Sequence, residues 1–484
     1  MTLYTNAYLW INDAWTAQPA ALLVDNGIIT DILYHNLPTN VASINLYGAY
    51  CYPGFTDTHT HSFEGGLYSL GVDLSVVRTI PELLALLGAN KHNSADTLFA
   101  WQLDEAQLAE KRFPTIAELD SVINLRPLVL RRIDGHSCML NTAARALVPG
   151  LTTKDEILRG TENDHAVHYF HKQIQPDTIL QAYQAAAKIA LQGGFTGIHT
   201  MIGDADNSIG HYSLIRDNLS KFPISYTIYP QSFNLKAALD AGASRIGGCI
   251  LADGSIGSMT AALNSPYENS DSRGVLYQSD QFWADFITQA AKHKFQVAVH
   301  CIGDRAIKQI NDVYKSLDST PLLRHQLIHC ELTDNTLIEE IYASGAVPVM
   351  QPNFDLLWGG DEGFYARKLG GQRSRIMNRF ASLMNHSIRV CGGSDWYITA
   401  LNAPMSIIAA MNHHNPAERL THAQAIAIYT KNAAWLSHEE NSRGAIKPGC
   451  QADFTIVNQP LDNFGTQPII QKVICKGVIR YEQV

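Results

Sequence analysis

Histidines that close short apolar segments are the residues of this sequence best suited to chemistry. His59 and His61 lie two residues apart at the end of one such segment, so on a strand both imidazoles point to the same side. An HxH pair alone is a weak signal, but His300, His329 and Asp395 each close another apolar segment. Imidazoles and a carboxylate suit Zn²⁺ or a similar borderline metal ion. If these segments end at a common point, the sequence predicts a metal site there.

Alternating strands and helices are the elements that must bring these residues together. Short apolar runs predict strands at 49–61, 196–201, 224–230, 249–253, 296–300, 326–329, 346–351 and 388–395. Helical patterns at 178–192, 281–294, 306–317 and 333–344 lie between them. Eight βα units predict an α/β protein with a TIM barrel, in which the carboxyl ends of all strands open onto one mouth. The five residues would meet at that mouth.

The two ends of the chain are rich in strand signals. Residues 22–29 carry Asn26-Gly27 between apolar runs, a strong hairpin signal. Residues 453–457 and 472–479 are also rich in β-branched side chains. We therefore expect residues 1–52 and 440–484 to form one small β domain together. The barrel, at 53–439, lies between them in the sequence. Two independent terminal domains are the alternative.

The stretch 62–177 holds more material than one crossover needs, including a further strand signal at 127–132. We interpret it as an insertion over the barrel mouth after the first barrel strand. The alternative is that the strand at 127–132 belongs to the barrel.

Composition excludes several classes of protein. The 484 residues include 36 basic and 45 acidic side chains, a net charge of −9 that is unlike a nucleic-acid binder. No run approaches the roughly 20 apolar residues of a membrane helix, and the first residues do not resemble a targeting segment. The eight cysteines are scattered singly, which indicates reduced thiols. We therefore expect a cytoplasmic protein that acts on a small molecule, without nucleic-acid or membrane partners.

The order His59-x-His61, His300, His329 and Asp395 resembles the amidohydrolase superfamily, in particular the long metal-dependent hydrolases that include N-substituted formamide deformylases. Four further stretches are similar to that branch: 253–263 (DGSIGSMTAAL), 299–306 (VHCIGDRA), 134–144 (DGHS followed by NTAA) and 444–453 (GAIKPGCQAD). The resemblance implies a distorted barrel, a β-sandwich built from both termini, a homodimer, and metal-assisted hydrolysis of a C–N bond.

The sequence departs from that branch at one position. The lysine that the branch usually carries four residues before Asp253, and that bridges two metal ions, is replaced by Cys249. A thiolate is itself a good zinc ligand, so Cys249 could bridge two ions or complete one site. The alternative is that Cys249 is a small buried hydrophobe. The expected cofactor is one or two divalent ions, with zinc the first candidate.

Roles at the site follow from this chemistry. A bound metal ion makes hydroxide available at neutral pH, and Asp395 would act as the general base; His300 and His329 are candidate catalytic residues as well as ligands. His136 and His199 are candidate donors to the substrate carbonyl, Arg132 could bind an anionic group, and Trp396 could wall the pocket. For each of these four residues, the alternative is a purely structural role. Asp57 could orient an imidazole of the site.

Other features lead to competing or weaker interpretations. A deaminase of the same fold usually places a Glu near the fifth-strand histidine, but Cys301-Ile302-Gly303-Asp304 follows His300. A binding protein that has lost its chemistry would explain the missing lysine but not the retained ligands. The glycines that bracket 351–371 indicate a mobile loop, and His413-His414 could bind a metal although they lie away from the strand ends.

Overall fold

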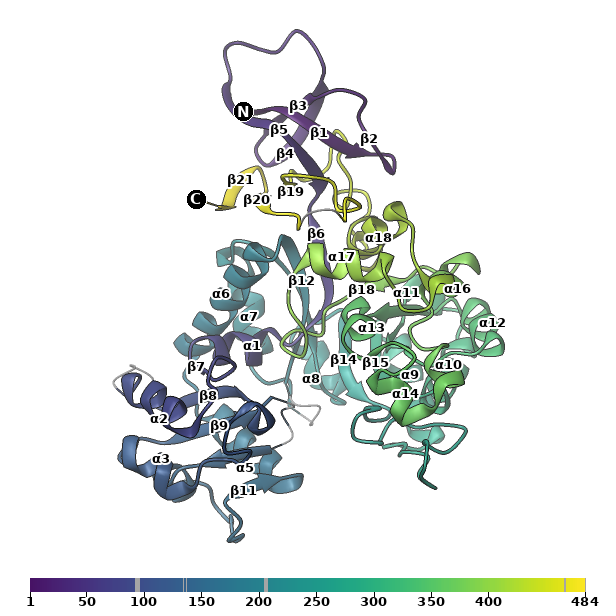
Figure 1. The fold of residues 1–484 in the computed structure, drawn as a ribbon. Coiled ribbons are helices and arrows are strands. Elements are labelled where there is room, and N and C mark those ends of the chain that lie inside the picture. The colour runs from purple at the N-terminus through teal and green to yellow at the C-terminus, as the bar shows by residue number, and fades with distance from the viewer. Residues whose placement is uncertain (92–95, 134, 136, 204–207, 465–466, 484) are drawn as a thin grey trace. The chain divides into compact units, whose positions relative to one another are not determined.

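The structure, a computed structural model, describes residues 1–91, 96–133, 135, 137–203, 208–464 and 467–483. It is an α/β protein, as predicted, with both parallel and antiparallel sheets (Figure 1). The chain divides into two compact units, residues 1–61 with 187–484 and residues 62–186. The first unit contains both chain ends and all six predicted metal ligands.

Strands from both ends of the chain share one mixed sheet (Figure 1). Its order is β21-β20-β19-β5-β1-β3-β4, with β2 paired to β1. The strands are β1 (Thr2–Ile11), β2 (Ala14–Trp15), β3 (Ala20–Asp25), β4 (Ile28–Leu33), β5 (Ala42–Pro53), β19 (Phe454–Val457), β20 (Ile470–Cys475) and β21 (Val478–Glu482). The N-terminal β5 and the C-terminal β19 pair antiparallel, with Cys51 opposite Ile456. The two ends of the chain therefore meet in one sheet.

The hairpin predicted from Asn26-Gly27 is confirmed. β3 and β4 pair antiparallel, with Val24 opposite Ile29. Asn26 and Gly27 have φ of 48° and 78°, the left-handed conformation that a tight two-residue hairpin turn requires at both central positions.

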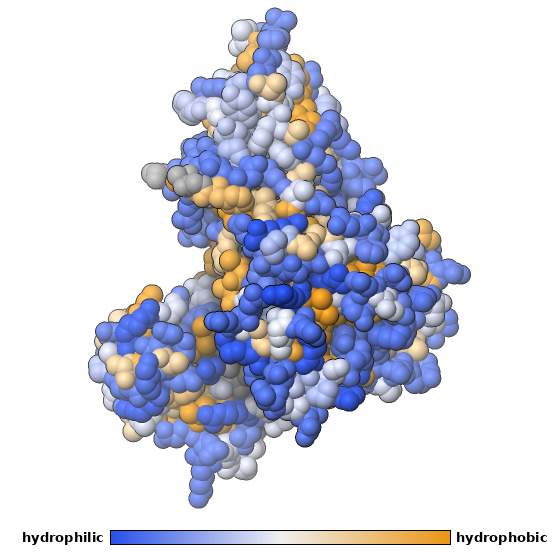
Figure 2. Space-filling model, turned by 45° about the vertical axis from the view of Figure 1, so that its right-hand side comes forward, coloured by the Kyte–Doolittle hydropathy of each residue, from blue (hydrophilic) through white to orange (hydrophobic). Residues whose placement is uncertain are grey.

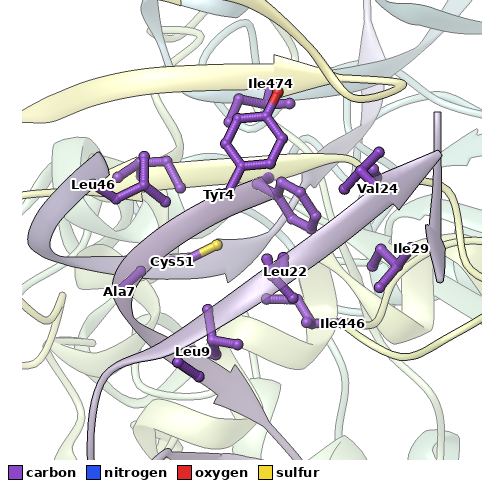
Figure 3. Packing of buried hydrophobic residues seen from close by; sticks show 14 of the residues in the cluster. Tyr4, Ala7, Leu9, Leu22, Val24, Ile29, Leu46, Cys51, Ile446 and Ile474 are labelled. Carbon is purple, nitrogen blue, oxygen red and sulfur yellow. The ribbon is translucent and has the colours of Figure 1, made fainter. Parts of the chain in front are cut away.

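The core of this sheet is built from both chain ends (Figure 3). Leu22 and Val24 of β3 and Cys51 of β5 are buried together with Ile446 and Ile474 from the C-terminal part. Burying each large aliphatic side chain contributes about 1.5–3 kcal/mol, so the sheet depends on residues more than 400 positions apart.

Eight strands form two parallel sheets in chain order. The first is β13-β12-β6 and the second is β14-β15-β16-β17-β18. Their bounds are β6 (Phe55–Thr60), β12 (Phe195–Ile202), β13 (Ser225–Pro230), β14 (Arg245–Leu251), β15 (Gln296–Cys301), β16 (Gln326–His329), β17 (Val347–Met350) and β18 (Cys391–Gly392). Between the sheets, β13 lies beside β14 and β18 beside β6. All eight predicted strand segments thus overlap an observed parallel strand.

Four helices lie where the sequence predicted them between strands. They are α6 (Pro176–Gln192), α9 (Asp280–Lys292), α10 (Asp304–Lys315) and α12 (Asn335–Ser344). Local signals set their ends: the side chain of Ser279 accepts from the Phe282 N–H at the start of α9, and Asp334 accepts from the Leu337 N–H at the start of α12. Gly345, with φ of 70°, ends α12.

Two sequence expectations need correction. Residues 351–371 are not a loop but contain the helices α13 (Pro352–Trp358) and α14 (Phe364–Leu369), because Phe354, Tyr365 and Leu369 are buried in an apolar cluster. The predicted strand at 49–61 is two strands separated at Gly54, where a side chain would collide with Thr196 and Asp453.

The unit 62–186 has its own sheet, of order β11-β10-β9-β8-β7. The strands are β7 (Val72–Asp73), β8 (Leu98–Leu103), β9 (Leu128–Arg132), β10 (Ser137–Leu140) and β11 (Ile157–Arg159). α2 (Ile80–Ala89), α3 (Ile116–Val122) and α5 (Thr161–Lys172) belong to the same unit. The strand signal at 127–132 is therefore β9, which pairs within this unit and not with the eight parallel strands.

Hydrophilic side chains predominate on the face shown in Figure 2, and hydrophobic residues form small groups between them. Helices with the length and hydropathy needed to cross a membrane are absent from the described residues.

Candidate metal centre

The six predicted ligands come from five of the parallel strands and the turns that follow them. His59 lies in β6, Cys249 in β14 and His300 in β15, while His329 ends β16; His61 directly follows β6, and Asp395 follows β18. Because neighbouring parallel strands end at the same edge of a sheet, residues up to 336 positions apart can converge.

Asp395 contacts two of the histidines through one oxygen. Its Oδ1 lies 3.2 Å from His59 Nε2 and 3.1 Å from His61 Nε2. His59 and Asp395 are buried, yet His59 Nε2 and Asp395 Oδ1 have no hydrogen-bond partner within the described residues. Buried polar atoms are nearly always paired, so two unpaired atoms that face each other are arranged as the ligand atoms of a metal site are. The three residues fit a divalent cation.

Backbone hydrogen bonds hold β6 and the turn after β18 in register. Oδ1 of Asp57 accepts from the N–H of His59 over 3.0 Å and from the N–H of Ser394 over 3.1 Å. The N–H of Asp395 donates to the His59 carbonyl over 2.9 Å. Asp57 was expected to orient an imidazole of the site, but its Oδ1 bonds to the backbone of the two segments that carry His59 and Asp395. It therefore fixes the spacing of these two residues.

A bulge in β14 sets the direction of Cys249. The pairing with β15 shifts register between Gly247 and Ile250, and Gly247 and Gly248 have φ of 95° and 89°. A Cβ on Gly247 would collide with the carbonyl oxygen of Ala298. The strand can therefore approach β15 this closely only with glycine, and the extra residue turns the side chain that follows.

Cys249 faces the histidines of the site. Its Sγ lies 3.8 Å from Nδ1 of His300, and one ligand atom each of Cys249, His59 and His329 lies within 4.8 Å of the others. Burial alone would raise the pKa of Cys249, but the surrounding imidazoles outweigh burial and hold it well below its usual value. The thiolate is the form of cysteine that binds metal ions.

His300 and His329 form the other side of the site, with ring centroids 4.5 Å apart. Nε2 of His300 lies 3.3 Å from the carbonyl oxygen of Gly254. Nδ1 of His329 lies 2.8 Å from Oε1 of Gln351, an oxygen that only accepts, so Nδ1 carries the proton and Nε2 keeps its lone pair. His329 is thereby held in the tautomer that can bind a metal through Nε2.

Two of the ligands have unusual backbone conformations. His329 has φ of 70° and Asp395 has φ of 55°, in the left-handed region that non-glycine residues rarely adopt. Such strain is kept only where the surrounding structure imposes it, and it is found most often at functional sites.

The charges of the site favour a cation. Burial raises the pKa of Asp395, but the adjacent imidazoles of His59 and His61 outweigh it and keep the carboxylate ionised. Burial lowers the pKa of His300, but Cys249 more than compensates and raises it to about 9. In a metal-free site, protons on the imidazoles thus balance the thiolate and the carboxylate. A divalent ion would replace those protons.

Two stretches that carry the family resemblance are bonded to each other through Asp253. Its carboxylate accepts from the N–H groups of Ala262 (2.8 Å), Ile302 (2.9 Å) and Gly303 (2.8 Å). Burial raises the pKa of Asp253 to about 6. The 253–263 loop is therefore fixed to the residues directly after His300.

The four candidate substrate-binding residues differ in their surroundings, and one of them is not described by the structure. Trp396 is buried next to Asp395, and its carbonyl oxygen accepts from the N–H of His61 over 2.5 Å. Arg132 lies in the unit 62–186, where its Nε pairs with Glu105 Oε2 at 2.9 Å. His136 lies outside the described residues. Whether any of these three contacts a substrate stays a prediction.

The side chain of His199 points away from the metal ligands, which corrects its expected role. Its Nδ1 lies 3.1 Å from the hydroxyl of Tyr229 and its Nε2 lies 2.9 Å from Oγ of Ser437. The Tyr229 hydroxyl in turn bonds to Gln296 and Gln326, the first residues of β15 and β16. His199 therefore faces the amino ends of these strands, and both its nitrogens are engaged.

Gln351 and the bonding role of Asp253 were not predicted from the sequence. Gln351 carried a usable signal, since it is the polar residue that closes the predicted strand 346–351. Asp253 lies at the end of a predicted strand in the same way.

Comparison with known proteins decides the family. The model of a family described as the Amidohydrolase family matches residues 42–481. The chain belongs to the amidohydrolase family. It is thus a hydrolase that acts on carbon–nitrogen bonds, and the family predicted from its motifs is confirmed.

Relatives of this amidohydrolase match over nearly their whole length. YtcJ of Bacillus subtilis (strain 168) is 27% identical over 96% of this chain and 96% of its own. The N-substituted formamide deformylase of Arthrobacter pascens is 22% identical over 99% of this chain and 98% of its own. The crystal structure of an uncharacterized metal-dependent hydrolase from Pyrococcus furiosus has a TM-score of 0.80 at 20% identity, covering 95% of this chain and 100% of that one. At this identity the last likeness concerns the fold alone.

Proposed function

We propose that this amidohydrolase uses one or two divalent metal ions, with zinc the first candidate, to hydrolyse an amide-type C–N bond of a small N-acyl or N-formyl compound. The observation that carries the proposal is the convergence of His59, His61 and Asp395 on one point, where His59 Nε2 and Asp395 Oδ1 are buried and unpaired among the described residues. The similarity to an N-substituted formamide deformylase supports the substrate class.

The ligands divide into two groups, and Cys249 of the second group also faces His59 of the first. His59, His61 and Asp395 form the first, and Cys249, His300 and His329 form the second. Because Cys249 also faces His59, we propose that its thiolate would help to hold the metal where the branch usually has a lysine. A set of imidazole nitrogens, a thiolate and a carboxylate is the one that Zn²⁺ prefers.

The protein side chains move the protons. A bound divalent ion would lower the pKa of a water molecule and polarise the substrate carbonyl. Asp395, kept ionised by His59 and His61, would accept the proton of the attacking water on its carboxylate and pass it to the leaving amine. Gln351 would keep His329 oriented during the reaction.

Two other functions are less favoured. A deaminase of this fold usually has a Glu soon after the fifth-strand histidine. The acid in that place here is Asp304, which is engaged, with Oδ1 accepting from the Asn264 N–H over 2.9 Å and Oδ2 from the Asn264 Nδ2 over 3.0 Å. A binding protein that has lost its chemistry has no reason to keep six ligands in contact.

We also propose that the eight parallel strands form one closed, distorted (β/α)8 barrel. The adjacency of β13 with β14 and of β18 with β6 supports it, as does the parallel bridge between Thr60 and Trp396. The terminal sheet would be the β-sandwich domain of such chains. A cytoplasmic location, a homodimer and a small-molecule substrate without nucleic-acid or membrane partners stay predictions.

The test is turnover of a library of N-formyl and N-acyl amines by metal-loaded protein, with Asp395→Asn beside it. General acid–base catalysis contributes about 10²–10⁴-fold, so we expect Asp395→Asn to lose at least about 100-fold in kcat while metal stays bound. Asp318→Asn, an exposed carboxylate in the turn after α10, is the matched control. Full activity in Asp395→Asn, or release of ammonia from heterocyclic amidines without any amide hydrolysis, would refute the proposal.

A further inference from the structure

The turn that carries Asp395 is closed by a buried threonine. The hydroxyl of Thr399 donates to the carbonyl oxygen of Ser394, the residue before Asp395. The N–H of Ile398 donates to the carbonyl oxygen of Asp395 over 2.7 Å. Thr399 is buried, so its hydroxyl bonds to the protein and not to bulk solvent. These two bonds tie residues 394–399 into a closed turn with Asp395 inside it.

Asn353 fixes the direction in which the Thr399 hydroxyl donates. It is the second residue of α13 and is fully buried. Its Nδ2 donates to Oγ1 of Thr399 over 3.1 Å and to the carbonyl oxygen of Ala400 over 3.3 Å. Because the carbonyl oxygen of Ala400 can only accept, the amide atom that faces it is the nitrogen. Oγ1 of Thr399 therefore accepts from Asn353 and donates its own proton to Ser394.

The backbone of Asp395 has a conformation that its surroundings must impose. Its φ of 55° lies in the left-handed region, which non-glycine residues avoid. The N–H of Asp395 donates to the carbonyl oxygen of His59 over 2.9 Å. The other polar group of the same peptide bond is the Ser394 carbonyl, which accepts from Thr399. The peptide bond before Asp395 is thus fixed on both sides, toward β6 by His59 and away from β6 by Thr399.

This peptide bond determines where the Asp395 carboxylate lies. Oδ1 of Asp395 is only three covalent bonds from the Asp395 Cα, and it lies 3.2 Å from Nε2 of His59 and 3.1 Å from Nε2 of His61. Loss of the bond to the Ser394 carbonyl would let the backbone relax toward a commoner φ and carry Oδ1 away from both nitrogens. A shift of about 1 Å in a reacting group can lower a rate about 100-fold.

We propose that Thr399, oriented by Asn353, is the positioning residue of Asp395. The inference rests on the proposed function of Asp395 as general base and metal ligand. Asn353 lies two residues after Gln351, whose Oε1 bonds to His329. The start of α13 would therefore orient one proposed ligand at the end of β16 and, through Thr399, the base that follows β18.

Removal of the Thr399 hydroxyl tests this in the metal-loaded full chain. Thr399→Val keeps the shape of the side chain, and we expect kcat to fall about 10–100-fold, the usual effect of losing a group that orients a ligand. KM should stay within about twofold, because in this proposal Thr399 does not touch the substrate. Thr399→Ser keeps the hydroxyl and should restore most of kcat. Wild-type kcat in Thr399→Val would overturn the proposal.

Thr455→Val is the matched control. It removes another buried threonine hydroxyl that donates to a backbone carbonyl, that of Gly194 over 2.8 Å, from β19 in the terminal sheet. We expect wild-type kcat in this variant. An equal loss of kcat in Thr455→Val and Thr399→Val would mean that any buried hydroxyl has this effect, and would overturn the proposal.

The Asp395→Asn background separates positioning from a merely structural role. The base is already absent there, so adding Thr399→Val should lower kcat no further. If the two losses multiply, Thr399 does not act through Asp395 and the proposal is wrong.

Binding of Co²⁺ to chelator-stripped protein gives a readout that does not depend on turnover. Because Asp395 is a proposed ligand, Thr399→Val should weaken Co²⁺ binding about 10-fold or more, while Thr399→Ser and Thr455→Val should bind like wild type. If the wild-type protein binds Co²⁺ but hydrolyses no amide, the proposed function fails and this arm alone decides the inference. Wild-type Co²⁺ affinity in a folded Thr399→Val protein would then overturn it.

Discussion

Nδ1 of His329 donates to Oε1 of Gln351 over 2.8 Å, at the ends of two neighbouring parallel strands. The amide nitrogen of the same Gln351 donates to the carbonyl oxygen of Val349, which fixes which end of the amide faces the histidine. The orientation of a proposed metal ligand is thus set by a residue that contacts neither the metal nor the substrate in our account.

We expect Gln351→Leu to lower metal affinity or activity about 10–100-fold, the usual effect of removing a partner that orients a metal-binding histidine. The side chains are similar in size, so packing should be kept. Equilibrium dialysis with Zn²⁺ and the kcat of the loaded enzyme measure the effect. Gln351→Glu, which keeps an acceptor for Nδ1, should restore most of it. Unchanged affinity and kcat in Gln351→Leu would show that the bond is incidental.

Replacement of Cys249 decides between its two interpretations. If the thiolate is a ligand, Cys249→Ser and Cys249→Ala should lower the number of bound ions or their affinity and abolish the thiolate-to-cobalt absorption. Cys391→Ala, which removes another buried free thiol, should leave the cobalt spectrum unchanged. A Cys249→Ala protein with wild-type metal content and spectrum would mean that Cys249 only fills space.

The buried His325 should make stability depend on pH. Its Nδ1 accepts from the N–H of Val297 over 3.0 Å, and burial lowers its pKa to about 4. An unfolded histidine titrates near about 6.5, so between these values the unfolded chain binds the additional proton. The contribution of neutral His325 to the free energy of unfolding is therefore complete above about pH 6.5. It falls by up to about 3 kcal/mol as the pH drops toward about 4.

His325→Gln keeps an acceptor but not the titration. Urea unfolding of the metal-free protein at several pH values between 7.5 and 5 should show a shallower loss of stability in His325→Gln than in wild type. His386→Gln, at an exposed histidine, should follow the wild-type curve. Parallel curves for wild type and His325→Gln would contradict the assignment.

The sequence was informative where strands are short and end in polar residues. The strand 326–329 was predicted with its observed bounds, and His300, His329 and Asp395 follow from such ends. The direction of a side chain within a strand was not predictable in the same way. All eight residues of β12 are buried, so no alternation of polar and apolar residues tells that His199 faces the amino ends of the strands.

Contacts between distant residues were also beyond the sequence. The pair His413-His414 was visible, but Asp355, whose Oδ1 lies 3.2 Å from Nε2 of His413, is 58 positions away and inside a segment expected to be a loop. Helices formed there because Phe354 and Tyr365 are buried against other parts of the unit, a tertiary effect that glycine spacing does not reveal. The placement of the unit 62–186 over the barrel mouth stays a prediction.

The most direct test of the central claim is the metal content of the purified chain, measured by plasma mass spectrometry without chelator, for wild type and for His59→Ala/His61→Ala. We expect the folded double variant to lose one or two equivalents of a divalent ion and all amide-hydrolysing activity. A double variant with the metal content of wild type, or a wild-type protein that is active without any bound metal, would contradict it.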